Sequence, residues 1–425
     1  MKILVITRNA WDDTNAIGNT LSNFFAGVDH IEFAAIYFRS AMPNNSLCRH
    51  YFKTSEIDVM RKWVHPSAIG KQFDLSAHNT VNEKKRSSVN EKKIVRIVQK
   101  YGLKVAYRLS DYLWYSEKWI NDNLDDFIKS FSPDMMVTFV KSAPQYYLTV
   151  KYLRQKYNIP LFSWIADDEY TGLLKNRAKR EIRNLQYILD ESVVVTGCSK
   201  ELCTYYNAVF GCNAKPLYKS CDLSLPIKKN LNDPITLVYA GNLVYGRLDI
   251  ICSIADALEQ LASSGFSAVL EVYSNTELLP QEEQRCFKAR PFVKYMGKKE
   301  YSYIKQRLSE ADIVLHVESF ENDQILKTKY SFSTKIIDYL QSGSVILAVG
   351  PQELASIRYI RDIPGAFIVD EIQKLSEKLK IFLGESDRFS EMAAQIRDYA
   401  QRHHSFSVAS ENMRKIIKET SKGEV

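Results

Sequence analysis

The feature that most limits the fold of this chain is an alternation of short apolar runs with helical segments. In the first half the apolar runs are "KILVIT", "IEFAAIYF", "DMMVTFV", "PLFSWIA" and "SVVVTGCS", and helical patterns such as 143–157 and 200–210 lie between them. Runs of this length without polar alternation are typical of strands buried on both faces of a parallel sheet. Their alternation with helices predicts a doubly wound α/β domain.

The same alternation begins again after the polar segment "PIKKNLNDP". The second set of apolar runs is "ITLVYAG", "SAVLEVYS", "FVKYMG", "DIVLHVE", "SVILAVG" and "GAFIVD". A chain of 425 residues is also too long for one ordinary core. We therefore expect an α/β protein with two Rossmann-like doubly wound domains, residues 1–228 and residues 229–402.

A long segment of mostly helical periodicity, about 40–132, separates the second and third strands of the first domain. We expect it to be a helical, basic insertion. Its part from Lys84 to Arg108 is rich in lysine and arginine and has apolar residues at helical spacing. Basic amphipathic helices occur both as solvated helices packed on a sheet and on membrane surfaces. Both interpretations stay open, and the second predicts binding to an anionic membrane surface.

The last segment of the chain, 403–425, has an apolar stripe at helical spacing. The residues of the stripe are Phe406, Ala409, Met413, Ile416 and Ile417. Such a stripe needs a surface to pack on. The segment therefore predicts a helix that either closes the second domain or crosses back to the first.

Composition excludes several classes of protein. No apolar run approaches the ~18 residues that span a bilayer, and "MKILVITRNAWDD" meets charged and turn residues too early for a signal peptide. We therefore expect a cytoplasmic protein. The seven cysteines are odd in number and include no Cys-x-x-Cys pair, which favours buried thiols over a disulfide framework or a zinc site. The net charge of +7 is compatible with an anionic ligand, and we expect no nucleic-acid partner.

Several catalytic signatures are missing from the sequence. It contains no G-x-S-x-G elbow, no G-x-G-x-x-G and no Walker A motif. These absences argue against a hydrolase with a serine nucleophile, a dinucleotide oxidoreductase and a P-loop NTPase. The seven histidines show no ligand spacing for a metal, and His316, near the end of a strand, is expected to be packed.

The stretch "SFSTKIIDYLQSGSVILAVGP" is the first candidate for a ligand site. It predicts a helix from about 333 to 342, with Ser333, Thr334 and Lys335 at its opening. Helix N-termini attract anions, so these residues would offer amides, hydroxyls and an ammonium to a phosphate. Asp338 lies one turn further on and could accept two ribose hydroxyls. The spacing suits a nucleoside diphosphate, although Lys335 and Asp338 also fit a plain surface ion pair.

The second candidate is "VYAGNLVYGRLDI", in which a strand, a glycine turn and a helix follow one another. Gly241 removes the side chain where a ligand would approach the main chain, and Asn242 follows it. Arg247, at the start of the helix, could donate two hydrogen bonds to a phosphate. An ordinary turn with an exposed arginine is the alternative for this segment taken alone.

The two candidates in this order make the second half resemble the donor-binding domain of retaining GT-B glycosyltransferases of the group-1 type. In that family the glycine turn carries basic residues for the donor diphosphate, and two glutamates eight residues apart precede an "EAMA.G.PV"-like ending. Here Asp338 stands in place of the second glutamate, Tyr330 in place of the first, and Asn242 in place of an arginine. The pattern is most similar to a variant of bacterial cell-surface polysaccharide transferases, "(F)STKI.DYL..G.PILA.GP", in which Lys335 and Asp338 recur.

The resemblance implies two domains that face a cleft and an enzyme that moves a sugar from a nucleoside-diphosphate sugar to an acceptor hydroxyl with retention. Arg247 and Lys335 would then stabilise the departing diphosphate, and Asp338 would bind the ribose. The resemblance implies no bound metal or other cofactor. It also implies a saccharide or lipid-linked acceptor in surface polysaccharide or glycolipid assembly, with the protein cytoplasmic or peripheral on the inner membrane face.

Candidates for the acceptor side come from the first half, where the resemblance is weaker. Glycines near the first strand let substrates approach in the family, which makes Gly18 a candidate, although a plain loop glycine before a helix is the alternative. Asp167 and Asp168 follow the strand "PLFSWIA". A carboxylate at that strand end could orient an acceptor hydroxyl.

Two other functions remain open. A non-catalytic GT-B-like partner subunit would explain the missing first glutamate and the altered glycine turn, and it would bind a nucleotide without turnover. A sugar-nucleotide epimerase of the same fold would act on the donor without an acceptor.

Overall fold

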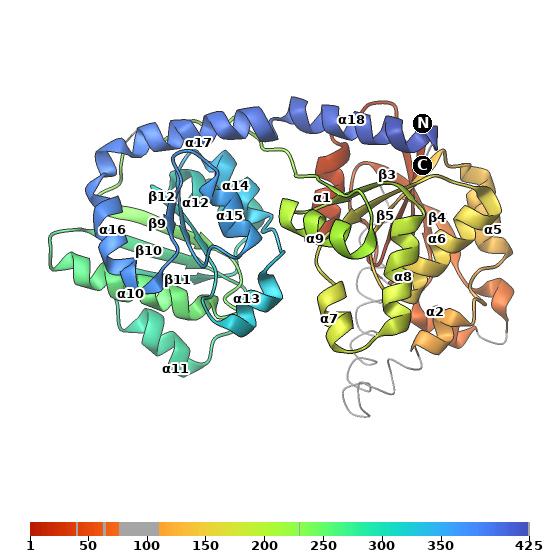
Figure 1. Ribbon diagram of the computed structural model, residues 1–425, viewed down its shortest axis with the longest axis horizontal. Helices are drawn as coiled ribbons and strands as arrows, with labels where there is room; N and C mark the ends of the chain where they lie inside the picture. The colour runs from red at the N-terminus through yellow and green to blue at the C-terminus, as the bar shows by residue number, and fades with distance from the viewer. Residues whose placement is uncertain (40, 63–64, 76–109, 229, 424–425) are drawn as a thin grey trace. The chain divides into compact units, whose positions relative to one another are not determined.

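The computed structural model describes residues 1–39, 41–62, 65–75, 110–228 and 230–423. The basic segment from Lys84 to Arg108 lies outside the described residues, and so does the membrane surface predicted on it. The chain forms two compact units (Figure 1). The N-terminal unit is Met1–Leu217 together with the residues from Ser410 onward, and the C-terminal unit is Tyr218–Ala409. The change of unit at Leu217 falls earlier in the chain than the predicted boundary at 228.

The N-terminal unit is built on an eight-stranded sheet with the strand order β4-β3-β2-β1-β5-β6-β7-β8. Its strands are β1 (Lys2–Thr7), β2 (Glu32–Tyr37), β3 (Cys48–Lys53), β4 (Lys71–Asp74), β5 (Met135–Phe139), β6 (Leu161–Ile165), β7 (Ser192–Gly197) and β8 (Lys215–Pro216). All neighbouring pairs are parallel except β3 with β4. Strands β1, β5 and β6 are buried almost throughout, as expected for the middle of a doubly wound sheet.

The helices of this unit follow its strands in turn. They are α1 (Ala16–Phe25), α2 (Glu56–Arg61), the 3₁₀ turn η1 (Pro66–Ala68), α5 (Asp122–Phe131), α6 (Pro144–Tyr157), α7 (Tyr170–Lys175), α8 (Lys179–Asp190), α9 (Lys200–Phe210) and α18 (Phe406–Lys422). Local sequence fixes several of their ends. The side chains of Asn15, Asn121 and Ser199 accept hydrogen bonds from first-turn amides of α1, α5 and α9, and Gly211 ends α9 in the left-handed conformation.

The prediction of a mostly helical insertion at 40–132 is wrong for two segments. Residues 48–53 and 71–74 form β3 and β4, which extend the sheet beyond β2. Strand β3 has the sequence CRHYFK, in which Tyr51 and Phe52 are buried while Arg49 is exposed. A strand near the sheet edge is covered less completely, so it carries polar residues and lacks the uninterrupted apolar run by which the central strands were recognised.

Helix α18 packs part of its apolar stripe in the N-terminal unit. Met413, Ile416 and Ile417 are buried, and the Arg414 guanidinium donates a hydrogen bond of 2.7 Å to the Gly27 carbonyl. The expectation for the start of the stripe is wrong, because Phe406 is 52% exposed.

The C-terminal unit is built on a six-stranded parallel sheet with the order β11-β10-β9-β12-β13-β14. Its strands are β9 (Ile235–Ala240), β10 (Ala268–Tyr273), β11 (Val293–Gly297), β12 (Ile313–Val317), β13 (Val345–Val349) and β14 (Phe367–Val369). The central strand β12 pairs Val314 with Val238 on one side and with Ile346 on the other. The second sheet is parallel throughout and the first is parallel except at β4, and the predicted pair of Rossmann-like domains is confirmed.

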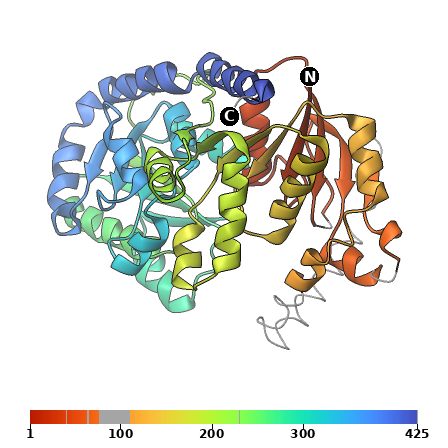
Figure 2. The same ribbon diagram turned by 45° about the vertical axis from the view of Figure 1, so that its right-hand side comes forward.

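Helices cover both faces of this second sheet. They are α10 (Arg247–Ala262), α11 (Pro280–Glu283), the π-helical turn η2 (Gln284–Lys288), α12 (Tyr301–Glu310), α13 (Asn322–Thr328), α14 (Lys335–Ser342), α15 (Ala355–Arg361), α16 (Leu375–Gly384) and α17 (Phe389–His404), with 3₁₀ turns η3 (Ile372–Lys374) and η4 (Ser386–Arg388). Helix α10 packs against α16, and α14 packs against α12 and α17. Figures 1 and 2 show α10, in green, and α17, in blue, on opposite sides of the sheet.

The expectation of unpaired thiols is wrong for one pair of cysteines. Cys252 on α10 and Cys286 in η2 are joined as a disulfide, with their Cα atoms 5.0 Å apart. The other five cysteines lie outside this disulfide, and four of them are buried. Sequence spacing could not reveal the pair, because α10 and η2 are brought together only by the folded sheet.

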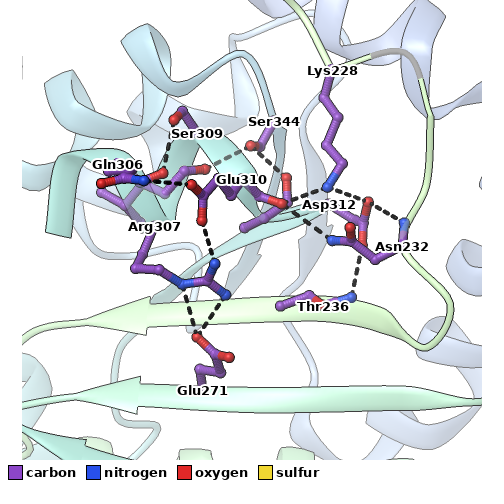
Figure 3. Close-up of polar contacts among 12 residues, drawn as sticks. Lys228, Asn232, Thr236, Glu271, Gln306, Arg307, Ser309, Glu310, Asp312 and Ser344 are labelled. Carbon is purple, nitrogen blue, oxygen red and sulfur yellow. Dashed lines mark hydrogen bonds and ion pairs between the residues drawn. The ribbon is translucent and has the colours of Figure 1, made fainter. Parts of the chain in front are cut away.

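A buried aspartate fastens the segment that leads into β9. The Asp312 side chain has no exposed surface, and it accepts hydrogen bonds from the Asn232 amide (3.1 Å), the Asn232 side chain (2.9 Å) and the Thr236 amide (2.7 Å). Lys228 Nζ lies 3.0 Å from the same carboxylate. Figure 3 shows this network beside the pair of Arg307 with Glu271. A buried carboxylate needs such compensation, so this group ties the starts of β9 and β12 together.

Candidate functional site

The parallel strands of the C-terminal unit end at one edge of their sheet, and polar residues follow several of them. Gly241 and Asn242 follow β9, Ser274 follows β10, Lys298 follows β11 and Glu318 follows β12. In open α/β sheets ligands bind outside this carboxyl edge. The same edge here borders two neighbouring cavities.

The larger cavity has a volume of about 380 Å³. Its lining includes Gly241, Asn242, Tyr301, Lys335, Asp338 and Tyr339. The smaller cavity, of about 210 Å³, is lined by Arg247, His316 and Glu318 and by the segment 331–335 that opens α14. Asn242, Lys335 and Tyr339 line both cavities. The two volumes together lie in the range of roughly 300–1,000 Å³ that is typical of small-molecule sites.

The structure thus brings all the predicted donor-side residues around one pair of cavities. They are Gly241, Asn242, Arg247, Ser333, Thr334, Lys335 and Asp338. Helix α14 begins at Lys335 rather than at Ser333, so Ser333 and Thr334 form the loop directly before the helix. The individual roles of these residues stay predictions.

Lys335 lies at the boundary between the two cavities. Its ammonium is 5.7 Å from the centre of the Tyr239 ring and next to Gly241. Burial, reinforced by the charge of Arg247, lowers the pKa of Lys335 to about 8, while Glu318 and Asp338 oppose the shift. The ammonium is therefore charged at neutral pH but held at an energetic cost, which an anionic ligand would relieve.

Lys335 packs in the space that a side chain on Gly241 would occupy. A Cβ atom on Gly241 would overlap the Lys335 ammonium and would lie 2.7 Å from the Tyr239 hydroxyl oxygen. That hydroxyl donates to the Asn242 carbonyl, which fixes the turn after β9. Gly241 was predicted to let a ligand come close to the main chain. In the structure the absence of its side chain lets the Lys335 ammonium come close.

Asp338 accepts hydrogen bonds on one carboxylate oxygen. The Tyr301 hydroxyl donates to Oδ1 at 2.7 Å, and the Gln341 side-chain amide donates to the same atom at 3.4 Å. Burial raises the pKa of Asp338, while the hydrogen bond from Tyr301 and nearby lysines lower it. Tyr301 was missed by sequence reasoning because it lies at the start of α12, far from Asp338 in the chain.

Arg247 is held by an acid that sequence reasoning also missed. Its guanidinium contacts the Glu318 carboxylate through Nε (3.1 Å) and Nη2 (3.0 Å), and Nη1 donates to the Asn242 side-chain oxygen at 2.7 Å. Burial raises the pKa of Glu318, and Arg247 opposes this shift. Glu318 directly follows β12, so the rule that singled out Gly241 at the end of β9 could have found it.

The acceptor-side candidates lie in the N-terminal unit. A Cβ on Gly18 would overlap the main chain of Asp12, so packing of α1 on that loop explains the glycine. After β6, Asp167 is exposed, and Asp168 accepts hydrogen bonds from the Tyr206 hydroxyl (3.4 Å) and the Thr171 amide (3.3 Å). These contacts give Gly18 and Asp168 structural roles, and their part in acceptor binding stays a prediction.

Metal clusters and membrane spans are both missing from the described ranges. Among the residues that the structure describes, no group of three or more His, Cys, Asp or Glu side chains could hold a metal ion. No described helix is long and apolar enough to cross a membrane. His316 is buried, with 3% of its surface exposed, as expected for a packed residue.

Two parallel-sheet units of this kind define the GT-B fold, and comparison with solved structures confirms it. HepE of Anabaena in complex with UDP aligns with a TM-score of 0.62 at 11% identity, over 98% of this chain and 100% of that one. Sucrose-phosphate synthase from Thermosynechococcus elongatus gives 0.60 at 12% identity over the whole of both chains. WaaG, a glycosyltransferase involved in lipopolysaccharide biosynthesis, gives 0.58 at 12% identity, over 97% and 99%. No protein-family model and no curated protein matches the sequence.

Proposed function

We propose that the protein is a glycosyltransferase that transfers a sugar from a nucleoside-diphosphate sugar to an acceptor hydroxyl with retention. The observation that carries the proposal is that Gly241, Lys335 and Asp338 line one cavity at the carboxyl edge of the second sheet. Solved structures of the same fold include HepE bound to UDP and HepE bound to UDP-glucose, which supports a nucleotide-sugar ligand.

The diphosphate would lie where the two cavities meet. Lys335 lines both of them there, and Ser333 and Thr334 stand beside it before the first turn of α14. Main-chain amides at a helix start and an ammonium together favour an anion. Lys335 and Arg247 would stabilise the negative charge that develops on the departing diphosphate in the transition state. Asp338 would bind the ribose, and we expect no metal or other cofactor to be needed.

The acceptor would be bound by the N-terminal unit, with Gly18, Asp167 and Asp168 as candidates. On the retaining route that the resemblance implies, the departing phosphate accepts the proton of the acceptor hydroxyl on the same face of the sugar. The reaction then needs no base from the protein. The bond between the sugar and the phosphate breaks, the bond to the acceptor oxygen forms, and the released nucleotide carries the proton. We expect a saccharide or lipid-linked acceptor in surface polysaccharide or glycolipid assembly, and a location in the cytoplasm or on the inner membrane face.

A non-catalytic nucleotide-binding subunit is the second candidate function. The observation that favours it is the engagement of Arg247 by Glu318, which neutralises one of the two cations proposed to stabilise the diphosphate. This function predicts that nucleotides bind and that no sugar is transferred or hydrolysed from the donor.

A thermal-shift panel tests the proposal, because a ligand that binds only the folded state raises the melting temperature. The panel contains UDP, GDP, ADP and CMP with their common sugar conjugates, on the wild type and on Lys335→Ala/Asp338→Ala. We expect one nucleotide family to stabilise the wild type and to lose this effect in the double variant. Absence of any shift at millimolar ligand would contradict nucleotide binding, and binding without any turnover across a panel of acceptors would favour the second candidate function.

A further inference from the structure

We propose that Tyr301 competes with the donor nucleotide for Asp338: its hydroxyl occupies an oxygen of this carboxylate that a ribose hydroxyl takes when the nucleotide binds. This inference rests on the proposed function, since it assumes that Asp338 binds a ribose. It goes beyond that function, because it gives a residue outside the sequence motifs a part in setting the affinity and the release of the nucleotide.

The oxygen Oδ1 of Asp338 already accepts from two donors. The Tyr301 hydroxyl lies 2.7 Å from it, and the Gln341 side-chain amide lies 3.4 Å from it. A carboxylate oxygen offers about two acceptor sites, so both sites on Oδ1 are in use, while Oδ2 accepts from neither of these groups. Two adjacent ribose hydroxyls meet a carboxylate best with one hydroxyl on each oxygen. A ribose bound in this way has to displace one of the two donors from Oδ1.

Tyr301 is the donor that is more easily displaced. Gln341 is 6% exposed, and its side-chain oxygen also accepts from the Asp222 amide at 3.1 Å. Tyr301 is 54% exposed, is the first residue of α12 and lines the larger cavity together with Asp338. Its hydroxyl can exchange the carboxylate for water, and the net cost of such an exchange is small. A nucleotide would therefore displace Tyr301 and leave Gln341 in place.

Asp338 needs such a donor before a nucleotide binds. Burial raises the pKa of Asp338, while the hydrogen bond from Tyr301 and the charges of Lys219 and Lys335 lower it. A desolvated carboxylate is more costly without hydrogen bonds than with them. Tyr301 thus stabilises the unbound protein and reduces the net gain from ribose binding. The nucleoside diphosphate left after transfer is then released more easily, because Tyr301 takes its place on Oδ1.

The test compares Tyr301→Phe with the wild type by calorimetry. The variant keeps the ring and removes only the hydroxyl. The probes are UDP, GDP and ADP, each with its 2′-deoxy and 3′-deoxy forms, which bring a single ribose hydroxyl to Asp338. Tyr303→Phe is the matched control, since Tyr303 is an exposed tyrosine of the same helix that borders neither cavity.

We expect Tyr301→Phe to bind the ribonucleotide roughly threefold to tenfold more tightly than the wild type, which is the net value of one hydrogen bond. This gain should disappear with at least one deoxy form, because a single hydroxyl can bind Oδ2 without displacing Tyr301. Tyr303→Phe should bind every form as the wild type does. Without nucleotide, Tyr301→Phe should melt at a lower temperature than the wild type. A purely structural role of Tyr301 would also lower the melting temperature, but it would not raise the affinity.

Three results overturn the proposal while nucleotide binding stands. Weaker binding of the ribonucleotide by Tyr301→Phe would make Tyr301 a ligand of the nucleotide rather than its competitor. An equal gain with the ribonucleotide and both deoxy forms would show that the hydroxyl does not compete with the ribose. Unchanged affinity throughout would show that Tyr301 stays on Asp338 or that the ribose binds elsewhere. A protein that binds none of these nucleotides overturns the proposed function and this inference with it.

Discussion

Arg247 meets Glu318 side-on, with Nη2 3.0 Å from both carboxylate oxygens and Nε 3.1 Å from Oε2. Both side chains are largely buried, 14% and 4% exposed. A buried pair of this kind gives up hydration on both sides, and removal of one partner leaves an uncompensated charge. The ion pair with Glu318 therefore holds the Arg247 guanidinium in a fixed position before a ligand binds.

Glu318→Gln should destabilise the ligand-free protein by about 3 kcal/mol, because Arg247 loses its buried counter-charge. A nucleoside diphosphate should then raise the melting temperature of the variant more than that of the wild type, since phosphate oxygens would replace the lost carboxylate. Differential scanning calorimetry with and without the nucleotide measures both effects.

Glu271→Gln is the matched control for Glu318→Gln. Glu271 is also largely buried, lies 3.0 Å from Arg307 and borders neither cavity. The Glu271→Gln variant should be less stable than the wild type, but the nucleotide should raise its melting temperature by the same amount as that of the wild type. If both variants respond to the nucleotide alike, Arg247 does not face the diphosphate.

Asp338→Asn should weaken nucleotide binding by roughly tenfold to a hundredfold, the usual value of hydrogen bonds to a charged group. The variant keeps the shape of the side chain and can still accept from Tyr301. Asp222→Asn, which breaks an ion pair of 2.7 Å with Lys305 in the same unit, should bind the nucleotide normally. Wild-type affinity in Asp338→Asn, determined by calorimetry, would rule out a ribose contact at this carboxylate.

Lys335 should make nucleotide binding depend on pH. Its ammonium loses the proton as the pH rises through about 8, so affinity for the diphosphate should fall between pH 7 and pH 9.5. Stability of the ligand-free protein should change in the opposite direction. The unfolded lysine keeps its proton up to its usual pKa of 10.5, so the unfolded state binds more protons between pH 8 and pH 10.5, and this contribution to stability rises with pH there.

Lys335→Met provides the reference for these pH profiles. It carries no titrating group at this position, so both the alkaline loss of affinity and the alkaline gain in stability should disappear relative to the wild type. Identical profiles for the two proteins would show that another group titrates in this range.

Gly241→Ala should weaken both folding and nucleotide binding, because the new methyl group occupies the place of the Lys335 ammonium. Overpacking of this kind costs roughly 1–3 kcal/mol. Gly384→Ala is the comparison: at that position in α16 a Cβ atom meets nothing within 4 Å. Urea titrations of the two variants, followed by nucleotide titrations, should show a defect for Gly241→Ala alone.

Asp312→Asn should lower stability by roughly 3–5 kcal/mol, since it leaves Lys228 without its buried partner and weakens the bonds to the 232–236 segment. Asp312 directly precedes β12 and Glu318 directly follows it, so the two lie at opposite ends of the strand, and Asp312 borders neither cavity. Chemical denaturation should report the loss, and nucleotide affinity of the folded fraction should be unchanged.

The sequence carried enough information for the central strands, because strands buried on both faces must be apolar throughout. The rule that parallel strands end at one edge, where helices begin, together with the family resemblance, singled out Gly241, Lys335 and Asp338, and these three residues line one cavity. The same reasoning failed for β3, whose polar residues interrupt the apolar run.

The residues that complete the site could not be read in this way. Tyr301 reaches Asp338 from another helix, and the contact of Glu318 with Arg247 joins positions 71 residues apart. Such pairs depend on the packing of α12 and α14 and on the order β9-β12 in the sheet. The periodicity of the sequence shows neither the packing of the helices nor the order of the strands. Buried partners of this kind can therefore be identified only from the three-dimensional structure.

The chain leaves the N-terminal unit at Leu217 and re-enters it at Ser410, and this has a consequence for biosynthesis. On the ribosome, residues 1–217 emerge first but must wait for Met413, Ile416 and Ile417 before their surface is covered. The C-terminal unit is one uninterrupted stretch and can close as soon as it has emerged. Residues 1–217 are therefore translated before the C-terminal unit but are covered only after it, and a ribosome that stalls between 218 and 409 leaves this surface uncovered.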